Sequence, residues 1–93
     1  MRKLTVIIPV YNESKTILQI LEKVLSVNVN KQIIVVDDCS NDDTPNKLLC
    51  LKDKIDKILF HKKNSGKGSA IRTAQKYIDG THVIIQDADL EYD

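Results

Sequence analysis

Short apolar runs rich in Val and Ile alternate along this chain with longer segments whose apolar residues recur at every third or fourth position. The runs are nearly continuous, which is the pattern of strands covered on both faces in a parallel sheet. The longer segments have the period of helices. The resulting order βαβαβαβ predicts an α/β fold, in which right-handed crossovers place helices on both faces of a parallel, Rossmann-like sheet. The predicted strands are 4–10, 32–36, 57–60 and 82–85.

The helical segments carry residues that are typical of helix starts and ends. In the segment 17–25 the apolar residues repeat at three and four, and Ser14 is placed to cap its start. A second helix is predicted over about 45–55, because a proline suits its first position. A third is predicted over about 68–78, and Gly80 can end it.

Charge and composition narrow the classes of protein that fit this chain. A net charge of +1 creates no overall field that favours nucleic acid or an anionic membrane. No apolar stretch reaches the roughly 18–20 residues that a membrane span requires. The cysteines lack metal-ligand spacing, which fits a reducing, cytoplasmic setting. We therefore predict that residues 1–93 are globular, with no nucleic-acid partner and no membrane span in this part. No helix follows the last predicted strand to cover it, so we expect the truncated half of a larger domain.

Polar clusters follow the first, second and fourth predicted strands. They are Tyr11-Asn12-Glu13, Asp37-Asp38 and Asp87-Ala88-Asp89. Ligands of open α/β sheets bind outside the carboxyl ends of the strands. We therefore expect the three clusters to meet at one edge of the sheet.

The last cluster has the spacing of a metal site. The carboxylates of Asp87 and Asp89 can point toward one divalent cation, and the small Ala88 between them leaves room for a ligand. Oxygen ligands suit Mg²⁺ or Mn²⁺, which usually complete their shell with water and substrate phosphates. Asp-x-Asp is also common in solvated turns, so the spacing alone leaves both interpretations open.

Each of the other clusters also has two interpretations. Asp38 can accept hydrogen bonds from a ribose or a base, or belong to a turn. Tyr11 can stack on a base or cover the core edge, and Glu13 can stabilise the start of the first helix. Pro9 lacks a donor for a sheet ladder, so we expect the first strand to bend or fray there.

A glycine-flanked lysine, Lys67, stands at the start of the third helix. Backbone N–H groups at such a position favour anions, so Lys67 or Arg72 can contact a phosphate or belong to a solvated basic face. The spacings GxxxxGK[ST] and GxGxxG are both absent. His61 and His82 have no partner at catalytic or metal-ligand spacing, and we assign them no role.

Together these segments resemble the family 2 glycosyltransferases of GT-A fold over the whole chain. The matching segments, in order, are VIIPVYNE (6–13), VVDDCSNDDT (35–44), NSGKGSAIRTA (64–74) and IIQDADLEYD (84–93). The DADLEYD ending is most similar to the dolichyl- or polyprenyl-phosphate sugar transferases. Cys39 stands where the family usually has glycine.

The resemblance implies a set of site residues. Those implied to bind the nucleotide sugar are Pro9, Tyr11, Glu13, Val36, Asp38, Lys67, Asp87, Ala88 and Asp89. Asp89 is implied as the direct metal ligand, with Asp87 and Glu91 beside it. The implied cofactor is Mg²⁺ or Mn²⁺, and the implied donor is a UDP- or GDP-sugar.

The resemblance further implies that this chain is the donor-binding N-terminal part of a larger enzyme, inactive alone, whose catalytic base lies beyond residue 93. The implied acceptor is a lipid phosphate or a cell-envelope glycan, used in the cytoplasm or at the inner face of the membrane. The sheet edge left uncovered favours a homo-oligomer. A sugar-nucleotide pyrophosphorylase is an alternative, but the glycine-rich loop typical after its first strand is absent. A receiver-like signalling module is another, but here the third strand ends in His61-Lys62-Lys63 rather than an Asp.

Overall fold

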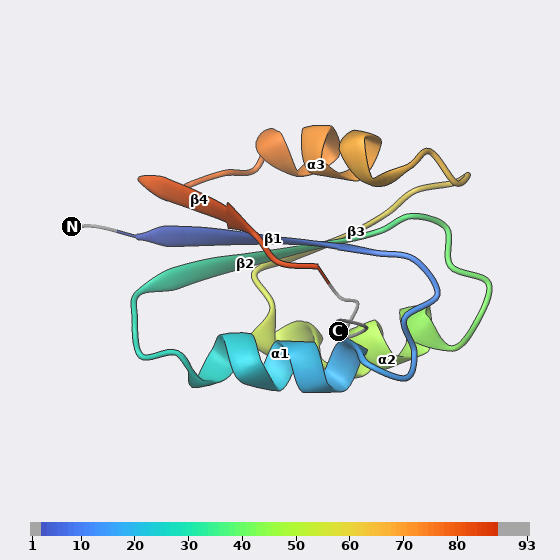
Figure 1. Cartoon of the computed structure of the whole chain (residues 1–93), viewed down its shortest axis with the longest axis horizontal. Coiled ribbons are helices and arrows are strands. Elements are labelled where there is room, and N and C mark those ends of the chain that lie inside the picture. The colour runs from blue at the N-terminus through green and yellow to red at the C-terminus, as the bar shows by residue number, and fades with distance from the viewer. Residues whose placement is uncertain (1–2, 88–93) are drawn as a thin grey trace, which may run out of the picture.

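The computed structural model describes residues 3–87, which form one parallel four-stranded sheet with helices on both faces (Figure 1). The elements are β1 (Leu4–Val10), α1 (Ile17–Ser26), β2 (Lys31–Asp37), α2 (Thr44–Cys50), the 3₁₀ turn η1 (Lys52–Lys54), β3 (Lys57–Phe60), α3 (Lys67–Gln75) and β4 (His82–Ile85). The strand order is β3-β2-β1-β4. The predicted fold class and the order of elements are confirmed.

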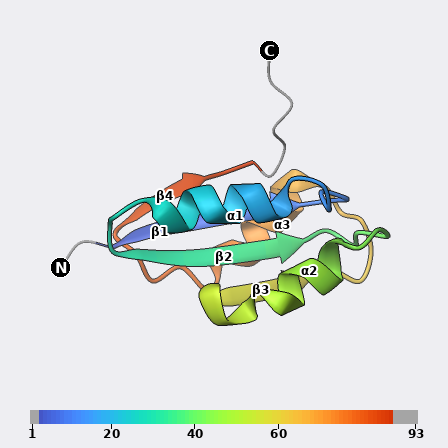
Figure 2. The same cartoon turned by 90° about the horizontal axis from the view of Figure 1, so that it is seen from below.

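The sheet separates two apolar layers. Val6 and Ile8 of β1 pack with α1 and α2 on one face, whereas Ile7 packs with Ala70 and Ala74 of α3 on the other. Successive side chains of a strand point to opposite faces, so the odd-numbered and the even-numbered residues must both be apolar. This explains the continuous runs. Figure 2 views the molecule from the side of α1 and α2.

Burial on both faces is confirmed for the central strands β1 and β2 and is wrong for the edge strands, because β3 is only partly buried and β4 is exposed. Every residue of β4 is exposed, and Val83, Ile84 and Ile85 keep 44%, 47% and 47% of their surface accessible. Within residues 3–87, β4 pairs with β1 alone, so its outer edge and much of both its faces remain uncovered. The candidate metal triplet thus follows an exposed strand.

The predicted caps of α1 and α3 are wrong. α1 begins at Ile17 with Thr16 before it, and the Ser14 N–H instead donates to Asp42 Oδ2 at 3.3 Å. α3 ends at Gln75, well before Gly80. α2 is also shorter than predicted, because the chain tightens into η1 after Cys50.

Gly80 serves a close approach of two segments rather than a helix end. A Cβ at this position would lie 2.4 Å from Thr5 Oγ1 and 2.7 Å from the Lys3 carbonyl. The Gly80 N–H donates to Thr5 Oγ1 at 2.9 Å, which fixes the start of β4 beside β1. The absence of a side chain therefore sets how closely β4 can join the sheet.

Pro9 does not end β1, which stays paired with β2 as far as Val10. The Ile7 carbonyl accepts the Gln86 N–H, whereas the Val10 carbonyl accepts the Asp38 N–H. In a parallel sheet the backbone groups of successive residues point alternately to the two neighbouring strands, so those of Pro9 point toward β4. On the β4 side the register ends with the pair Ile7 and Ile85, before Pro9. The missing N–H of Pro9 therefore removes no hydrogen bond to β2.

Candidate functional site

A cavity of about 240 Å³ opens at the carboxyl ends of the strands. β2 and β4 lie on opposite sides of β1, and ligands of open α/β sheets bind where the strand order reverses in this way. The cavity is lined by Pro9, Val10, Tyr11, Glu13, Asp38, Lys67, Ala70 and Asp87. Residues from all three polar clusters therefore meet at one edge, as the sequence predicted.

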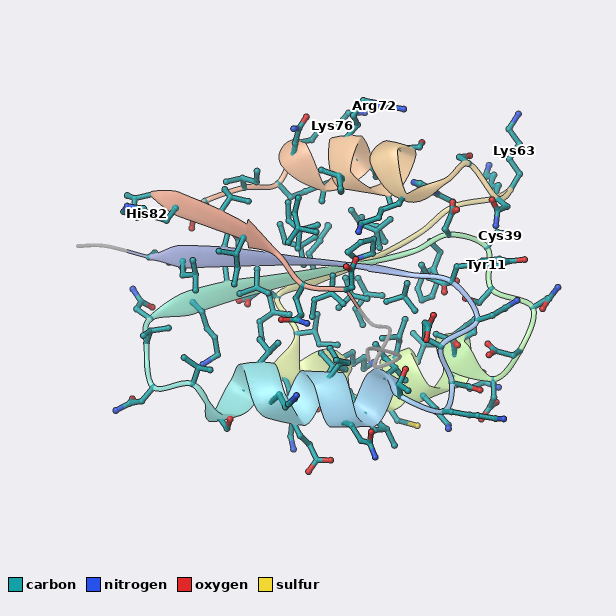
Figure 3. All side chains as sticks on the ribbon, in the orientation of Figure 1. Tyr11, Cys39, Lys63, Arg72, Lys76 and His82 are labelled. Carbon is teal, nitrogen blue, oxygen red and sulfur yellow. The ribbon has the colours of Figure 1, made fainter. Side chains whose placement is uncertain are left out.

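Tyr11 lies at the mouth of this edge with 43% of its surface exposed. Figure 3 shows Tyr11 and Cys39 at the same end of the sheet, whereas His82 lies at the opposite end. An aromatic ring that is half-exposed beside a cavity offers a flat face for a planar ligand. The cavity volume lies somewhat below the range of about 300–1,000 Å³ usual for ligand pockets.

Asp38 is almost fully buried at the wall of the cavity, and its carboxylate is held from several directions. Its Oδ1 accepts hydrogen bonds from His61 Nδ1 at 2.7 Å and the Ser65 N–H at 2.9 Å. Its Oδ2 accepts the Gly66 N–H at 2.8 Å. Because a carboxylate has about four acceptor positions, these donors leave little capacity for a ligand.

The same contacts control the ionisation of Asp38. Burial alone raises the pKa of this carboxyl, but the hydrogen bonds from His61, Ser65 and Gly66 outweigh burial and hold the pKa below its usual value. Asp38 is therefore an anion at neutral pH. It can accept hydrogen bonds from a ligand and has no proton to donate.

The loops after β1 and β2 are interlocked by side-chain hydrogen bonds. The Asn12 N–H donates to Ser40 Oγ at 2.8 Å, and the Asn41 N–H donates to Asn12 Oδ1 at 2.8 Å. The Glu13 N–H donates to the buried Thr44 Oγ1 at 3.1 Å. The segment after β2 thereby fixes the backbone at Asn12 and Glu13, directly after Tyr11.

Asp37 and Cys39 shape the loop after β2. Asp37 accepts hydrogen bonds from the backbone and hydroxyl of Ser40, so it belongs to a turn. Cys39 has φ of +64°, in the left-handed region that favours glycine. Cys39, which stands where the family usually has glycine, is thus a strained residue beside the site.

Comparison with known proteins decides the family. The sequence profile described as glycosyl transferase family 2 matches residues 5–93. The chain belongs to glycosyl transferase family 2. It is 33% identical over 93 residues to the dolichol-phosphate mannosyltransferase of Pyrococcus furiosus, covering 97% of this chain and 26% of that protein.

Solved structures show the same fold in other glycosyltransferases. S. aureus TarS 1–349 in complex with UDP-GlcNAc superposes with a TM-score of 0.86 at 30% identity, over 96% of this chain and 27% of that one. The mannosyltransferase PcManGT from Pyrobaculum calidifontis, in complex with GDP-Man and Mn²⁺, gives 0.85 at 29% identity, over 92% and 27%. The GT-A fold and the family resemblance are confirmed. The chain spans less than a third of each of these proteins.

Within this family 2 segment, Lys67 and Asp87 form an ion pair at the wall of the cavity. Lys67 Nζ lies 2.5 Å from Asp87 Oδ1, and both side chains are more than half exposed. An ion pair at such exposure contributes at most about 1 kcal/mol, because water screens it. Either partner can therefore exchange the other for a ligand at small cost.

The other residues implied by the resemblance have different positions. Val36 is fully buried in the layer beneath α3 and does not line the cavity. Ala88, Asp89 and Glu91 lie outside the described residues. Among residues 3–87, no group of three His, Cys, Asp or Glu side chains is arranged to hold a metal. Asp87, at the cavity and with an oxygen donor that suits Mg²⁺ or Mn²⁺, fits such an ion as one ligand.

His61 is the site residue that sequence reasoning missed. It follows β3 at the same edge of the sheet as the polar clusters, and that position is the signal that could have found it. The ring contacts Asp38 through Nδ1 and Thr73 Oγ1 through Nε2, at 2.7 and 2.8 Å. Val10 and Ala70 were also missed, because apolar lining residues carry no motif.

Proposed function

We propose that this chain is the donor-binding part of a metal-dependent glycosyltransferase, which transfers a sugar from a UDP- or GDP-sugar to a polyprenyl phosphate or a cell-envelope glycan. The observation that carries the proposal is the cavity at the reversal of strand order, lined by an aromatic, a buried carboxylate, a cation and an exposed carboxylate. The relative and the solved structures whose names include dolichol phosphate, UDP-GlcNAc and GDP-Man support it.

Each lining group has a chemical counterpart in such a donor. Tyr11 offers a face for the base, and Asp38 accepts a hydrogen bond from a base N–H or a ribose hydroxyl. Lys67 offers a positive charge to a phosphate, since its pairing with Asp87 is exposed and weak. Pro9 and Glu13 complete the wall, and Val36 supports it from the core.

The metal would be held by Asp87 and Asp89, with Glu91 as a further contact, and Ala88 between the two aspartates leaves space for the diphosphate. When bound, a divalent cation stabilises negative charge on a departing nucleoside diphosphate. Asp87 is the member of this set at the described cavity wall. Mg²⁺ and Mn²⁺ both suit its carboxylate.

Calorimetric titration with UDP- and GDP-sugars, with and without Mn²⁺, tests the proposal. We expect Mn²⁺-dependent binding of one donor, weakened about tenfold or more by Asp87→Asn or Asp89→Asn. Asp79→Asn is the matched control, because Asp79 pairs with Lys3 at 3.3 Å at the opposite edge. A folded chain that binds no donor, or binds equally without metal and in all variants, overturns the proposal.

We further propose that the protein acts in the cytoplasm, at the inner face of the membrane where a lipid phosphate is reached. Among residues 3–87, no helix has the length and apolar character needed to cross a bilayer.

The edge of β4 that residues 3–87 leave uncovered supports pairing with a second copy of the chain. Sedimentation velocity tests the pairing, and Ile84→Lys on the exposed strand should abolish any dimer it reveals.

A further inference from the structure

His61 connects three separate parts of the fold through one largely buried ring. The side chain is 13% exposed and follows β3. Its Nδ1 contacts Asp38 after β2 at 2.7 Å, and its Nε2 contacts Thr73 in α3 at 2.8 Å. A ring engaged at both nitrogens has a fixed orientation.

The protons of this network can be assigned from its geometry. Asp38 is an anion, so Nδ1 must carry the proton that joins His61 to it. Thr73 Oγ1 donates its one proton to the Ser69 carbonyl at 3.0 Å, and its oxygen lies 2.8 Å from His61 Nε2. The ring is thus held at both nitrogens, with the Nδ1–H toward Asp38.

Asp38 transmits this order to the start of α3. Its oxygens hold the N–H groups of Ser65 and Gly66, and Gly66 precedes Lys67, the first residue of α3. Gly66 has φ of +92°, which glycine adopts without steric cost, and Asp38 holds this turn through the two N–H groups. The contacts that orient Asp38 therefore also place Lys67 at the cavity.

We propose that His61 is the positioning residue of the donor site: it fixes the Asp38 carboxylate, and through Asp38 the Ser65-Gly66-Lys67 wall of the cavity. His61 does not line the cavity itself, so it acts through these neighbours. The consequence for ligand affinity rests on the proposed function. The consequence for the order of the loop does not.

Two NMR measurements on this chain test the positioning directly. Long-range ¹H–¹⁵N correlations at about pH 8, where an ordinary histidine is neutral, should show a protonated Nδ1. In His61→Phe the amides of Ser65 and Gly66 should exchange about tenfold faster or more, relative to amides of the β1–β2 core. An Nε2–H tautomer, or exchange that accelerates equally everywhere, overturns the proposal.

Matched variants separate positioning from general stability. An asparagine side-chain amide can stand in for Nδ1, so His61→Asn should restore slow exchange at Ser65 and Gly66 to within about threefold of the parent chain. Thr73→Val keeps the shape of the side chain and removes the hydroxyl that contacts Nε2. It should accelerate exchange at Ser65 and Gly66 by less than His61→Phe does, and it tests the network if His61→Phe does not fold. His82→Phe, at the opposite end of the sheet, should change nothing at this loop. Equal loop exchange in His61→Phe, His61→Asn and the parent chain overturns the proposal.

Donor affinity then connects the loop to function. At a temperature where every variant is folded, His61→Phe should raise the Kd of the donor that the parent chain binds by about five- to tenfold, and His61→Asn by less than about threefold. A Kd that follows only the melting temperature of the variants overturns the positioning role. If the parent chain binds no donor, the proposed function fails while the NMR results still decide the role of His61.

Discussion

Replacing Asp38 with asparagine tests the central contact of the site. The amide keeps one acceptor oxygen and exchanges the other for an NH₂ donor. With its oxygen toward His61 and Ser65, its NH₂ faces the Gly66 N–H, and two donors then oppose each other. The remaining bonds also lose the strength that a charged acceptor confers.

The magnitude follows from the burial of the group. Asp38 is 4% exposed, so solvent screening reduces these interactions little. Losing one hydrogen bond to a charged group costs about 1.5–3 kcal/mol, and leaving the Gly66 N–H unsatisfied adds to this. We expect Asp38→Asn to lower the free energy of unfolding by about 3 kcal/mol, measured by urea denaturation at pH 7.

The pH dependence gives the sign of the effect. The pKa of Asp38 is lowered in the folded chain, so its stabilisation is present above the unfolded value of about 3.9. It is lost as pH falls through the folded pKa, because the unfolded chain binds the proton more readily. The difference between the parent chain and Asp38→Asn should therefore shrink as the pH falls below about 4.

Asp43→Asn is the matched control for this measurement. Asp43 lies in the same loop and is exposed, and its carboxylate accepts a hydrogen bond from Asn46 Nδ2 at 2.9 Å. Its replacement should change the free energy of unfolding by less than about 0.5 kcal/mol. An Asp38→Asn chain as stable as this control, or a stability difference that does not vary with pH, would refute the account of Asp38 as a charged anchor.

Five further substitutions test local packing by the same denaturation assay. Cys39→Gly removes a side chain from a left-handed residue and should stabilise by about 0.5–1 kcal/mol, whereas Cys39→Ala should not. Gly80→Ala places a Cβ 2.4 Å from Thr5 Oγ1 and should destabilise by about 2–3 kcal/mol, whereas Gly68→Ala, with a nearest contact of 3.5 Å, should stabilise by about 0.5–1 kcal/mol. Leu48→Ala, at a fully buried side chain, should cost about 2–4 kcal/mol.

The fold was predictable because its signals are local. Continuous Val and Ile runs gave β1, β3 and β4 their observed limits, and β2 differs by one residue at each end. The caps were not predictable in the same way. Ser14 is a good capping residue by type, but the Glu13 carbonyl accepts the Thr16 and Ile17 N–H groups, so Ser14 lies inside the turn that precedes α1. Gly80 suits a helix end by type, but the approach of Thr5 decides its role.

The location of the candidate site at one edge of the sheet was predictable, but the hydrogen bonds among its side chains were not. The rule that ligands bind beyond the strand ends placed Tyr11, Asp38 and Asp87 together without any knowledge of side-chain contacts. Which atoms of Asp38 are engaged depends on the loop before α3. Its partners His61, Ser65 and Gly66 are 23 to 28 positions away in sequence. No spacing rule connects residues at that separation, so a histidine without a sequence partner was assigned no role.

The position of Asp38 changes what this carboxylate can do for a nucleotide. A free aspartate at a strand end could accept a pair of hydrogen bonds from a base, whereas this one already holds donors from His61, Ser65 and Gly66. The remaining acceptor capacity suits a single ligand N–H or hydroxyl. Discrimination between bases must therefore come largely from the shape of the wall that Asp38 supports. On this reasoning, altering His61 changes donor affinity by moving the wall, and altering Tyr11 changes it by removing a contact.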